Sequence, residues 1–100
     1  MTLERLPTPH PGDLLREELE TLGKTAYWLA KNLGVPQMAV SEILRGKRGI
    51  SAAMALRLGR FFGNSAEFWL NLQAFHDLRE EERRMGEQLR RIEPLSGRAA

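Results

Sequence analysis

The sequence contains no cysteine, two histidines and no long apolar run, and each shortage excludes a class of protein. Without cysteine no disulfide framework can form. No apolar stretch approaches the roughly 18 residues that a membrane-spanning helix needs. The first residues, MTLER, lack the pattern of a signal peptide. We therefore expect an intracellular, cytoplasmic protein that has no membrane partner.

Residues that carry enzymatic or metal chemistry are also scarce. His10 and His76 lie far apart in the sequence, and neither belongs to an H-E-x-x-H motif or to a cluster with metal-ligand spacing. His76 and Glu80 share a helical face, but two ligands make a poor metal site. The glycines around Lys47 and Arg48 lack the strand and the final Ser or Thr of a phosphate-binding loop. The sequence therefore predicts no enzyme, no cofactor and no metal ion.

Length and charge indicate one small domain with an uneven charge distribution. The 100 residues are 42% hydrophobic, which suffices for one core. The net charge is +2, which is too small by itself to identify a nucleic-acid partner. Residues 45–60 contain no acidic side chain but five cations, Arg45, Lys47, Arg48, Arg57 and Arg60. Residues 77–82 contain four acids, Asp77, Glu80, Glu81 and Glu82, against Arg79 alone.

The stretch 25–50 has the pattern of two short helices joined by a tight turn. Thr25 is a predicted N-cap, because its hydroxyl can accept a hydrogen bond from an unpaired backbone N–H. Gly34 follows a helix over 26–33 and suits the left-handed residue that ends a helix. Pro36 is the predicted first residue of a second helix over 36–45, since its missing N–H costs nothing there. This is the outline of a helix-turn-helix, with an inner face made by Leu29, Ala30 and Leu33.

The second of these helices has the features of a DNA-reading helix. Its apolar positions are predicted to face inward: Val40, Ile43 and Leu44. The N-terminal end of such a helix contacts base edges in the major groove, and its outward residues here are Gln37, Met38, Ser41 and Glu42. Gln suits adenine, Glu suits cytosine N4, Ser suits either, and Met suits a thymine methyl. The loop after the helix carries three cations that we expect to bind DNA phosphates, namely Arg45, Lys47 and Arg48.

Three further helices are expected around this pair. The first, over 12–23, has a predicted core stripe of Leu14, Leu15, Leu19 and Leu22. Ser51 caps a helix over 52–62, in which the core face is either Ala55, Leu58 and Phe62 or Leu56 and Phe61. Ser65 caps a last helix with no obvious stop before Gly86 or Pro94. We predict an all-α five-helix bundle, with an extended arm over residues 1–11, the helical domain over 12–94 and a flexible tail over 95–100.

The last helix carries an apolar seam with three-four spacing, made by Phe75, Leu78, Met85, Leu89 and Ile92. The seam packs either back onto its own domain or against a second copy, and the pattern leaves both interpretations open. A single helix-turn-helix covers only a half-site, so a palindromic operator favours a homodimer. Phe68 and Trp69 together exceed what one helix face can bury. We assign to the dimer interface Trp69, Phe75, Leu78, Met85, Leu89 and Ile92.

A different class of function is also compatible with the two-helix pattern. Two amphipathic helices separated by glycine and proline also form hairpins that never contact DNA, and basic loops are often only solvated surface. Under that alternative the chain is a protein-interaction module. DNA binding is favoured by the joint spacing of Ala30, Gly34, Val40 and Ile43 and by the basic loop directly after them.

Several motifs, in order along residues 10–80, resemble one family. They are His10-Pro11-Gly12, Gly34-Val35-Pro36, GKRGISA over 46–52, ALRL over 55–58, FGNS over 62–65 and FWLNLQ over 68–73. This set resembles the HigA-type antitoxins, also called VapI-like, of the XRE/Cro helix-turn-helix family.

The resemblance implies a lambda-repressor-like fold in a homodimer that binds double-stranded operator DNA. Such a protein represses its own toxin–antitoxin operon and neutralises a small basic RelE/HigB-like toxin that cleaves mRNA. The resemblance places base contacts at Gln37, Met38, Ser41 and Glu42, and phosphate contacts near Thr25, Arg45, Lys47 and Arg48. Relatives often carry arginines in the recognition helix where this sequence has Gln37 and Ala39. The alternative is a stand-alone helix-turn-helix transcriptional regulator without a toxin partner.

Overall fold

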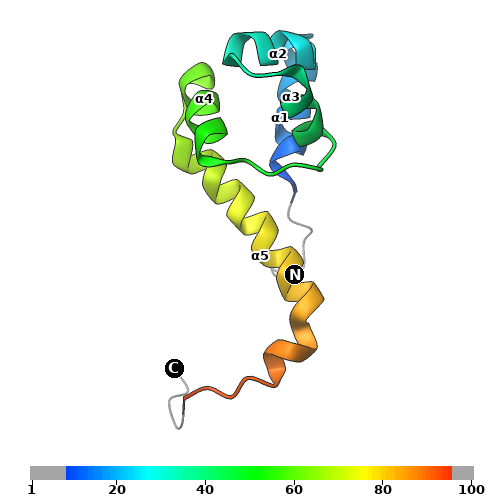
Figure 1. Ribbon diagram of the computed structural model, residues 1–100, viewed down its shortest axis with the longest axis vertical. Helices are drawn as coiled ribbons and strands as arrows, with labels where there is room; N and C mark the ends of the chain where they lie inside the picture. The colour runs from blue at the N-terminus through cyan, green and yellow to red at the C-terminus, as the bar shows by residue number, and fades with distance from the viewer. Residues whose placement is uncertain (1–8, 96–100) are drawn as a thin grey trace.

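The computed structural model describes residues 9–95, and within this range the chain forms five helices and no strand (Figure 1). They are α1 (Pro11–Leu22), α2 (Ala26–Leu33), α3 (Gln37–Leu44), α4 (Ala52–Phe62) and α5 (Ala66–Arg90). Helices α1 to α4 and the start of α5 form a head, from which the rest of α5 projects as a stalk. The molecule is therefore elongated, with extents of 54 × 24 × 23 Å. The predicted all-α fold of five helices is confirmed.

The predicted helix ends are confirmed where polar caps and glycines mark them. The hydroxyls of Thr25, Ser51 and Ser65 accept hydrogen bonds of 3.0–3.1 Å from backbone N–H groups in the first turns of α2, α4 and α5. Gly34 ends α2 with φ 72° and Gly63 ends α4 with φ 78°. A side chain with a Cβ is strained in that left-handed conformation, so glycine is the residue that stops these two helices.

The starts of α1 and α3 differ from the predictions. Pro36 was expected to be the first residue of the second helix, but it is the N-cap of α3, with φ −63° and an extended ψ of 145°. The proline ring fixes φ only, and the extended ψ places the helix start at Gln37. His10, which no pattern had marked as a cap, accepts a hydrogen bond from the Gly12 N–H at 2.9 Å through Nδ1. Its capping of α1 makes Pro11, the last residue of the predicted arm, the first helical residue.

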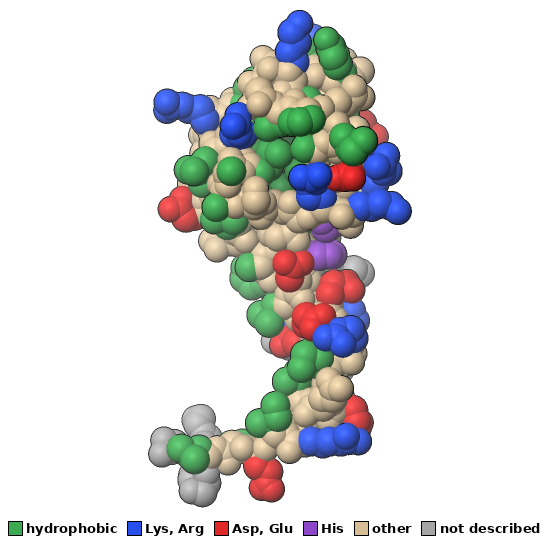
Figure 2. Space-filling model, in the orientation of Figure 1, with side chains coloured by type: hydrophobic (Ala, Val, Ile, Leu, Met, Phe, Trp, Pro, Cys, Tyr) green, Lys and Arg blue, Asp and Glu red, His purple; other side chains and the backbone are tan. Residues whose placement is uncertain are grey.

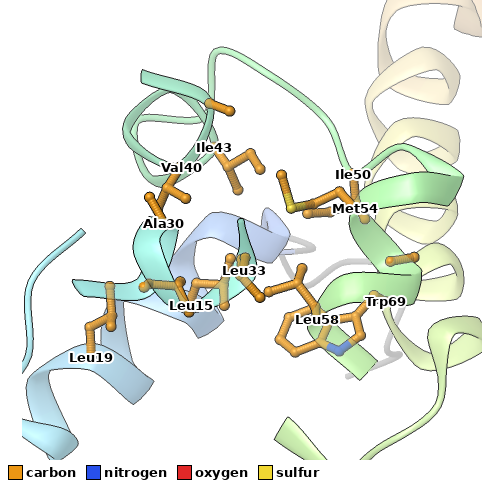
Figure 3. Close-up of a cluster of buried hydrophobic side chains, with 13 residues drawn as sticks. Leu15, Leu19, Ala30, Leu33, Val40, Ile43, Ile50, Met54, Leu58 and Trp69 are labelled. Atoms are coloured by element: carbon orange, nitrogen blue, oxygen red, sulfur yellow. The ribbon is translucent and has the colours of Figure 1, made fainter. Parts of the chain in front are cut away.

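The core lies where the five helices meet, and Figure 3 shows its side chains pointing toward one another. Each helix contributes at least one fully buried side chain, from Leu15, Leu29, Val40, Ile43, Leu58 and Trp69. The buried residues of α4 include Ala55 and Leu58 of the first predicted core face, whereas Leu56 of the second is 65% exposed. Leu22 was a predicted core residue but is 47% exposed, because it is the last residue of α1 and lies at the rim of the core.

Trp69 corrects one prediction about the dimer interface. Its side chain is only 1% exposed, and its Nε1–H donates a hydrogen bond to Asn64 Oδ1 at 2.9 Å. The indole fills the core and has its one polar group satisfied there, so it is not available to a second copy. Of the aromatic pair, Phe68 is the exposed member at 42%.

Helix α5 continues through Gly86 and ends at Arg90, between the two stops that the sequence suggested. With 3.6 residues per turn, the apolar seam lies on the side of the helix opposite the core residues Trp69 and Gln73. Phe75, Leu78 and Ile92 are more than half exposed. In Figure 2 hydrophobic side chains follow one side of the stalk. The seam therefore does not fold back onto the head.

No helix within residues 9–95 combines the length and apolar character that crossing a membrane requires. Residues 1–8 of the predicted arm and residues 96–100 of the predicted tail lie outside the described residues.

Candidate DNA-binding surface

The turn between α2 and α3 is closed by backbone hydrogen bonds. The N–H of Val35 donates to the Ala30 carbonyl at 3.1 Å, and that of Gly34 donates to the Lys31 carbonyl at 3.3 Å. This pattern satisfies carbonyls that the end of a helix leaves unpaired. Ala30 and Val40 are both buried, 2% and 1% exposed, and the small side chain of Ala30 allows α2 and α3 to pack closely. The predicted helix-turn-helix is therefore present in the structure.

The outer face of α3 brings together three of the four predicted base-contacting residues. Gln37, Met38 and Ser41, together with Arg45, line one shallow surface hollow. Met38 is 66% exposed, whereas the inner residues Ala39, Val40 and Ile43 are buried. Because the inner face of α3 is buried in the core, the hollow on its outer face faces away from the head in a fixed orientation.

The fourth predicted base-contacting residue, Glu42, is paired within the chain. Its carboxylate accepts hydrogen bonds from Arg48, at 2.8 Å from Nε and 2.6 Å from Nη2. The loop between them is closed by the N–H of Lys47, which donates to the Glu42 carbonyl at 2.8 Å, and by Gly46 with φ 74°. The ion pair holds the Arg48 guanidinium close to the end of α3.

The other predicted phosphate contacts lie on the same side of the head or at the start of α2. Arg45, Lys47 and Arg48 are exposed, and Figure 2 shows Lys and Arg side chains gathered over α3 and the loop that follows it. The Thr25 hydroxyl accepts the capping bond from Trp28 N–H at 3.1 Å and keeps its own hydrogen to donate. The remaining two cations of the basic run, Arg57 and Arg60, lie instead on α4, on the opposite side of the head in Figure 1.

Contacts from α1, which the sequence did not mark, hold the C-terminal end of α3. An ideal Cβ on Gly12 lies 2.0 Å from the Ile43 carbonyl oxygen, so only glycine lets the helices come this close. The Arg16 guanidinium donates a hydrogen bond to the Leu44 carbonyl. Both contacts fix the orientation of α3 from the side that faces α1.

Gln73 fixes the far end of the loop after α3. Its buried side chain accepts a hydrogen bond from the Ile50 N–H at 2.8 Å and donates to Asp77 at 2.9 Å. The FWLNLQ motif contained this residue, but its distance of 23 positions from Ile50 gave no local signal. The loop with the three cations is therefore tied at both ends, by α3 and by α5.

The two histidines, far apart in sequence, meet where α1 begins. The rings of His10 and His76 pack edge to face with centroids 4.9 Å apart. Burial and the neighbouring His76 lower the pKa of His10, while Asp13 and Asp77 act in the opposite direction. Across the described part of the chain no three His, Asp or Glu side chains are grouped so that they could hold a metal ion.

Comparison with known proteins identifies the class to which this architecture belongs. A family model described as helix-turn-helix matches residues 15–69. Virulence-associated protein I of Dichelobacter nodosus is 49% identical over 78 residues, which cover 77% of this chain and 72% of that protein.

Solved structures narrow the class. A HigA-family addiction module antidote protein from Coxiella burnetii has a TM-score of 0.87 and 41% identity, covering 90% of this chain and all of that one. The Pseudomonas aeruginosa antitoxin HigA, solved with the higBA promoter, has a TM-score of 0.84 and 44% identity, covering 88% and 98% of the two chains. The chain therefore belongs to the helix-turn-helix proteins of the XRE family and, among them, to the HigA-type antitoxins. The resemblance inferred from the motifs is confirmed.

Proposed function

We propose that this chain is a repressor of its own toxin–antitoxin operon and that it neutralises a RelE/HigB-like toxin that cleaves mRNA. The observation that carries the DNA-binding part is the shared hollow of Gln37, Met38, Ser41 and Arg45 on the outward face of α3. Side chains that hydrogen-bond to base edges lie there beside a cation that can bind phosphate. Binding of a promoter by the similar Pseudomonas HigA supports the same use of this surface.

The residues of the surface divide into two roles. Gln37 and Met38 read bases from the exposed first turn of α3, and the half-buried Ser41 adds a hydroxyl one turn further along the same face. Arg45, Lys47 and Arg48 bind phosphates, with Thr25 adding a hydroxyl at the start of α2. In the free chain Glu42 orients Arg48 through their ion pair.

The seam of α5 is the proposed contact between two copies. Phe75, Leu78, Met85 and Leu89 share a face of α5 that the head does not cover, whereas Ile92, predicted as part of the seam, follows the end of the helix at Arg90. A two-fold contact along this face joins two heads, and each head then reads one half-site of a palindromic operator. The rest of the stalk surface carries charged pairs between neighbouring turns of α5, such as Arg84 with Glu81. These exposed charges favour contact with solvent over contact with a second copy.

A gel-shift titration of the chain's own promoter fragment at several salt concentrations tests the DNA-binding part. Replacing Lys47 and Arg48 with Ala should weaken binding to specific and random duplexes alike and lower the salt slope by about 0.9 per lost phosphate contact. Gln37→Ala should instead change the preference at one base pair by about 1–3 kcal/mol. Arg60→Ala is the matched control, because this cation belongs to the same basic run but lies on α4.

The outcomes separate the candidate functions. Equal effects of the two substitutions on specific and random DNA would contradict the assigned roles. No retardation of the promoter by the unchanged chain would favour a protein-interaction module. A neighbouring reading frame for a small basic protein, with co-purification of its product, tests toxin neutralisation. Retardation without such a partner would favour a stand-alone regulator.

A further inference from the structure

A hollow between α1, the end of α4 and the start of α5 is not used by the proposed DNA-binding surface. Its lining side chains are Leu14, Glu18, Phe62, Asn64, Phe68 and Trp69. Phe68 is 42% exposed and packs edge to face on the buried Trp69, with ring centroids 5.2 Å apart. A half-exposed aromatic ring beside an apolar hollow is the kind of anchor around which protein interfaces form.

Helix α1, which forms one wall of this hollow, carries a negative net charge. Helix α1 has one cation, Arg16, which is held by Asp13 and by the Leu44 carbonyl. It has four acids, Asp13, Glu17, Glu18 and Glu20, all of them exposed. Glu18 lies in the lining of the hollow itself. The occupant that complements a carboxylate beside aromatic rings is an arginine or lysine side chain, which gains an ion pair and a ring face together.

The hollow lies on the side of α1 turned away from the recognition helix. Gly12 and Arg16 mark the flank of α1 that touches α3. Leu14 and Glu18 mark the flank that lines the hollow. In a helix with 100° between successive residues, the mean directions of these two pairs are about 160° apart. A partner in the hollow and a duplex on α3 therefore occupy opposite sides of α1.

We infer that the hollow and the acidic face of α1 form the docking surface for the toxin. This inference rests on the proposed function. A protein that binds and cleaves mRNA has to present cations to the phosphates of its substrate. Glu18 and its acidic neighbours pair with those cations, and Phe68 anchors the apolar part of the contact. Cations of the toxin that are paired in this way can no longer bind RNA phosphates, while α3 remains free to bind the operator.

Two substitutions at the hollow and one beside it test this surface. Glu18→Lys reverses the charge of an exposed lining residue, and Phe68→Ser removes the exposed ring. Glu20→Lys is the matched control, because Glu20 is an exposed acid of the same helix that does not line the hollow. The probe is the purified product of the adjacent toxin gene, carrying a substitution that inactivates its nuclease, titrated into each full-length chain by calorimetry.

We expect Glu18→Lys and Phe68→Ser each to weaken toxin binding by about tenfold or more, with operator affinity unchanged, and Glu20→Lys to have a much smaller effect. Toxin added to the chain bound to its operator should produce a slower band in a gel shift. Circular dichroism melting of each variant checks that the head is folded.

Three results would overturn the inference. Full toxin affinity in both hollow variants would place the docking surface elsewhere and leave toxin neutralisation intact. Conversion of a dimer into a monomer by Phe68→Ser would make the hollow a contact between two copies of the chain. An unchanged chain that fails to bind the toxin would refute toxin neutralisation itself, and this surface with it.

Discussion

Gly12→Ala is the substitution for which the structure makes the sharpest quantitative prediction. An ideal Cβ on Gly12 lies 2.0 Å from the carbonyl oxygen and 2.9 Å from the carbonyl carbon of Ile43. Real Cβ atoms keep at least 3.0 Å from such neighbours, so the oxygen is about 1 Å too close. Both atoms belong to the backbone of α3 and cannot rotate away. The first turn of α1 has to separate from the last turn of α3.

The expected loss of stability follows from the cost of overpacking. Forcing one extra methyl into a well-packed contact costs about 1–3 kcal/mol, and a backbone neighbour favours the upper end of that range. In a domain of this size, each 1 kcal/mol corresponds to a fall in Tm of roughly 4–8 °C. Gly86→Ala is the matched control, because the nearest atom to its ideal Cβ is Arg90 Nη1 at 3.8 Å. The same methyl there should stabilise α5 by about 1 kcal/mol, since alanine is the better helix former.

Urea unfolding followed by circular dichroism measures both variants against the unchanged chain. The two alanine substitutions should shift the midpoint in opposite directions with similar slopes. Gly12→Ala should also weaken operator binding under conditions where the chain stays folded, because the contact orients the end of α3. A Gly12→Ala chain as stable as the unchanged one would refute the argument that the α1–α3 contact requires glycine.

Two further predictions concern the start of α1 and the stalk. Because the folded state lowers the pKa of His10, the unfolding free energy should be highest above the ordinary histidine pKa of about 6.5 and fall as pH drops through the lowered value. His10→Asn, which caps α1 without titrating, should remove that pH dependence in urea titrations, and an unchanged pH profile would show that His10 is not its source. Leu89→Glu should convert a dimer into a monomer in sedimentation experiments. Gln88→Glu, which adds the same charge at an exposed neighbouring position, should leave the dimer intact. A Leu89→Glu chain that is folded and still dimeric would exclude the seam as the interface.

Local signals predicted much of the fold. Thr25, Ser51 and Ser65 cap helices because a hydroxyl and a backbone N–H a few residues apart pair without help from the rest of the chain. Gly34 and Gly63 end helices for an equally local reason, the backbone conformation that only glycine adopts freely. The inner and outer faces of α3 follow from helical periodicity alone, apart from the burial of Ala39.

Other features could not be predicted, because they depend on pairs that are distant in the chain. No spacing rule connects Gly12 with Ile43, His10 with His76 or Gln73 with Ile50. The continuous basic run over 45–60 also separates in space, with Arg45 near α3 and Arg60 on α4.

The sequence by itself determined the helix ends that a capping hydroxyl or a glycine marks, and most of the residues that α3 presents, since these features depend on neighbours within about one helical turn. Only the tertiary structure decided that Trp69 fills the core while Phe68 stays exposed. Both residues are large, apolar and adjacent, and only the packing of α5 against the other helices tells them apart. The same packing places Glu18 of α1 beside Phe68 and away from α3, and this arrangement separates the proposed toxin surface from the proposed DNA surface.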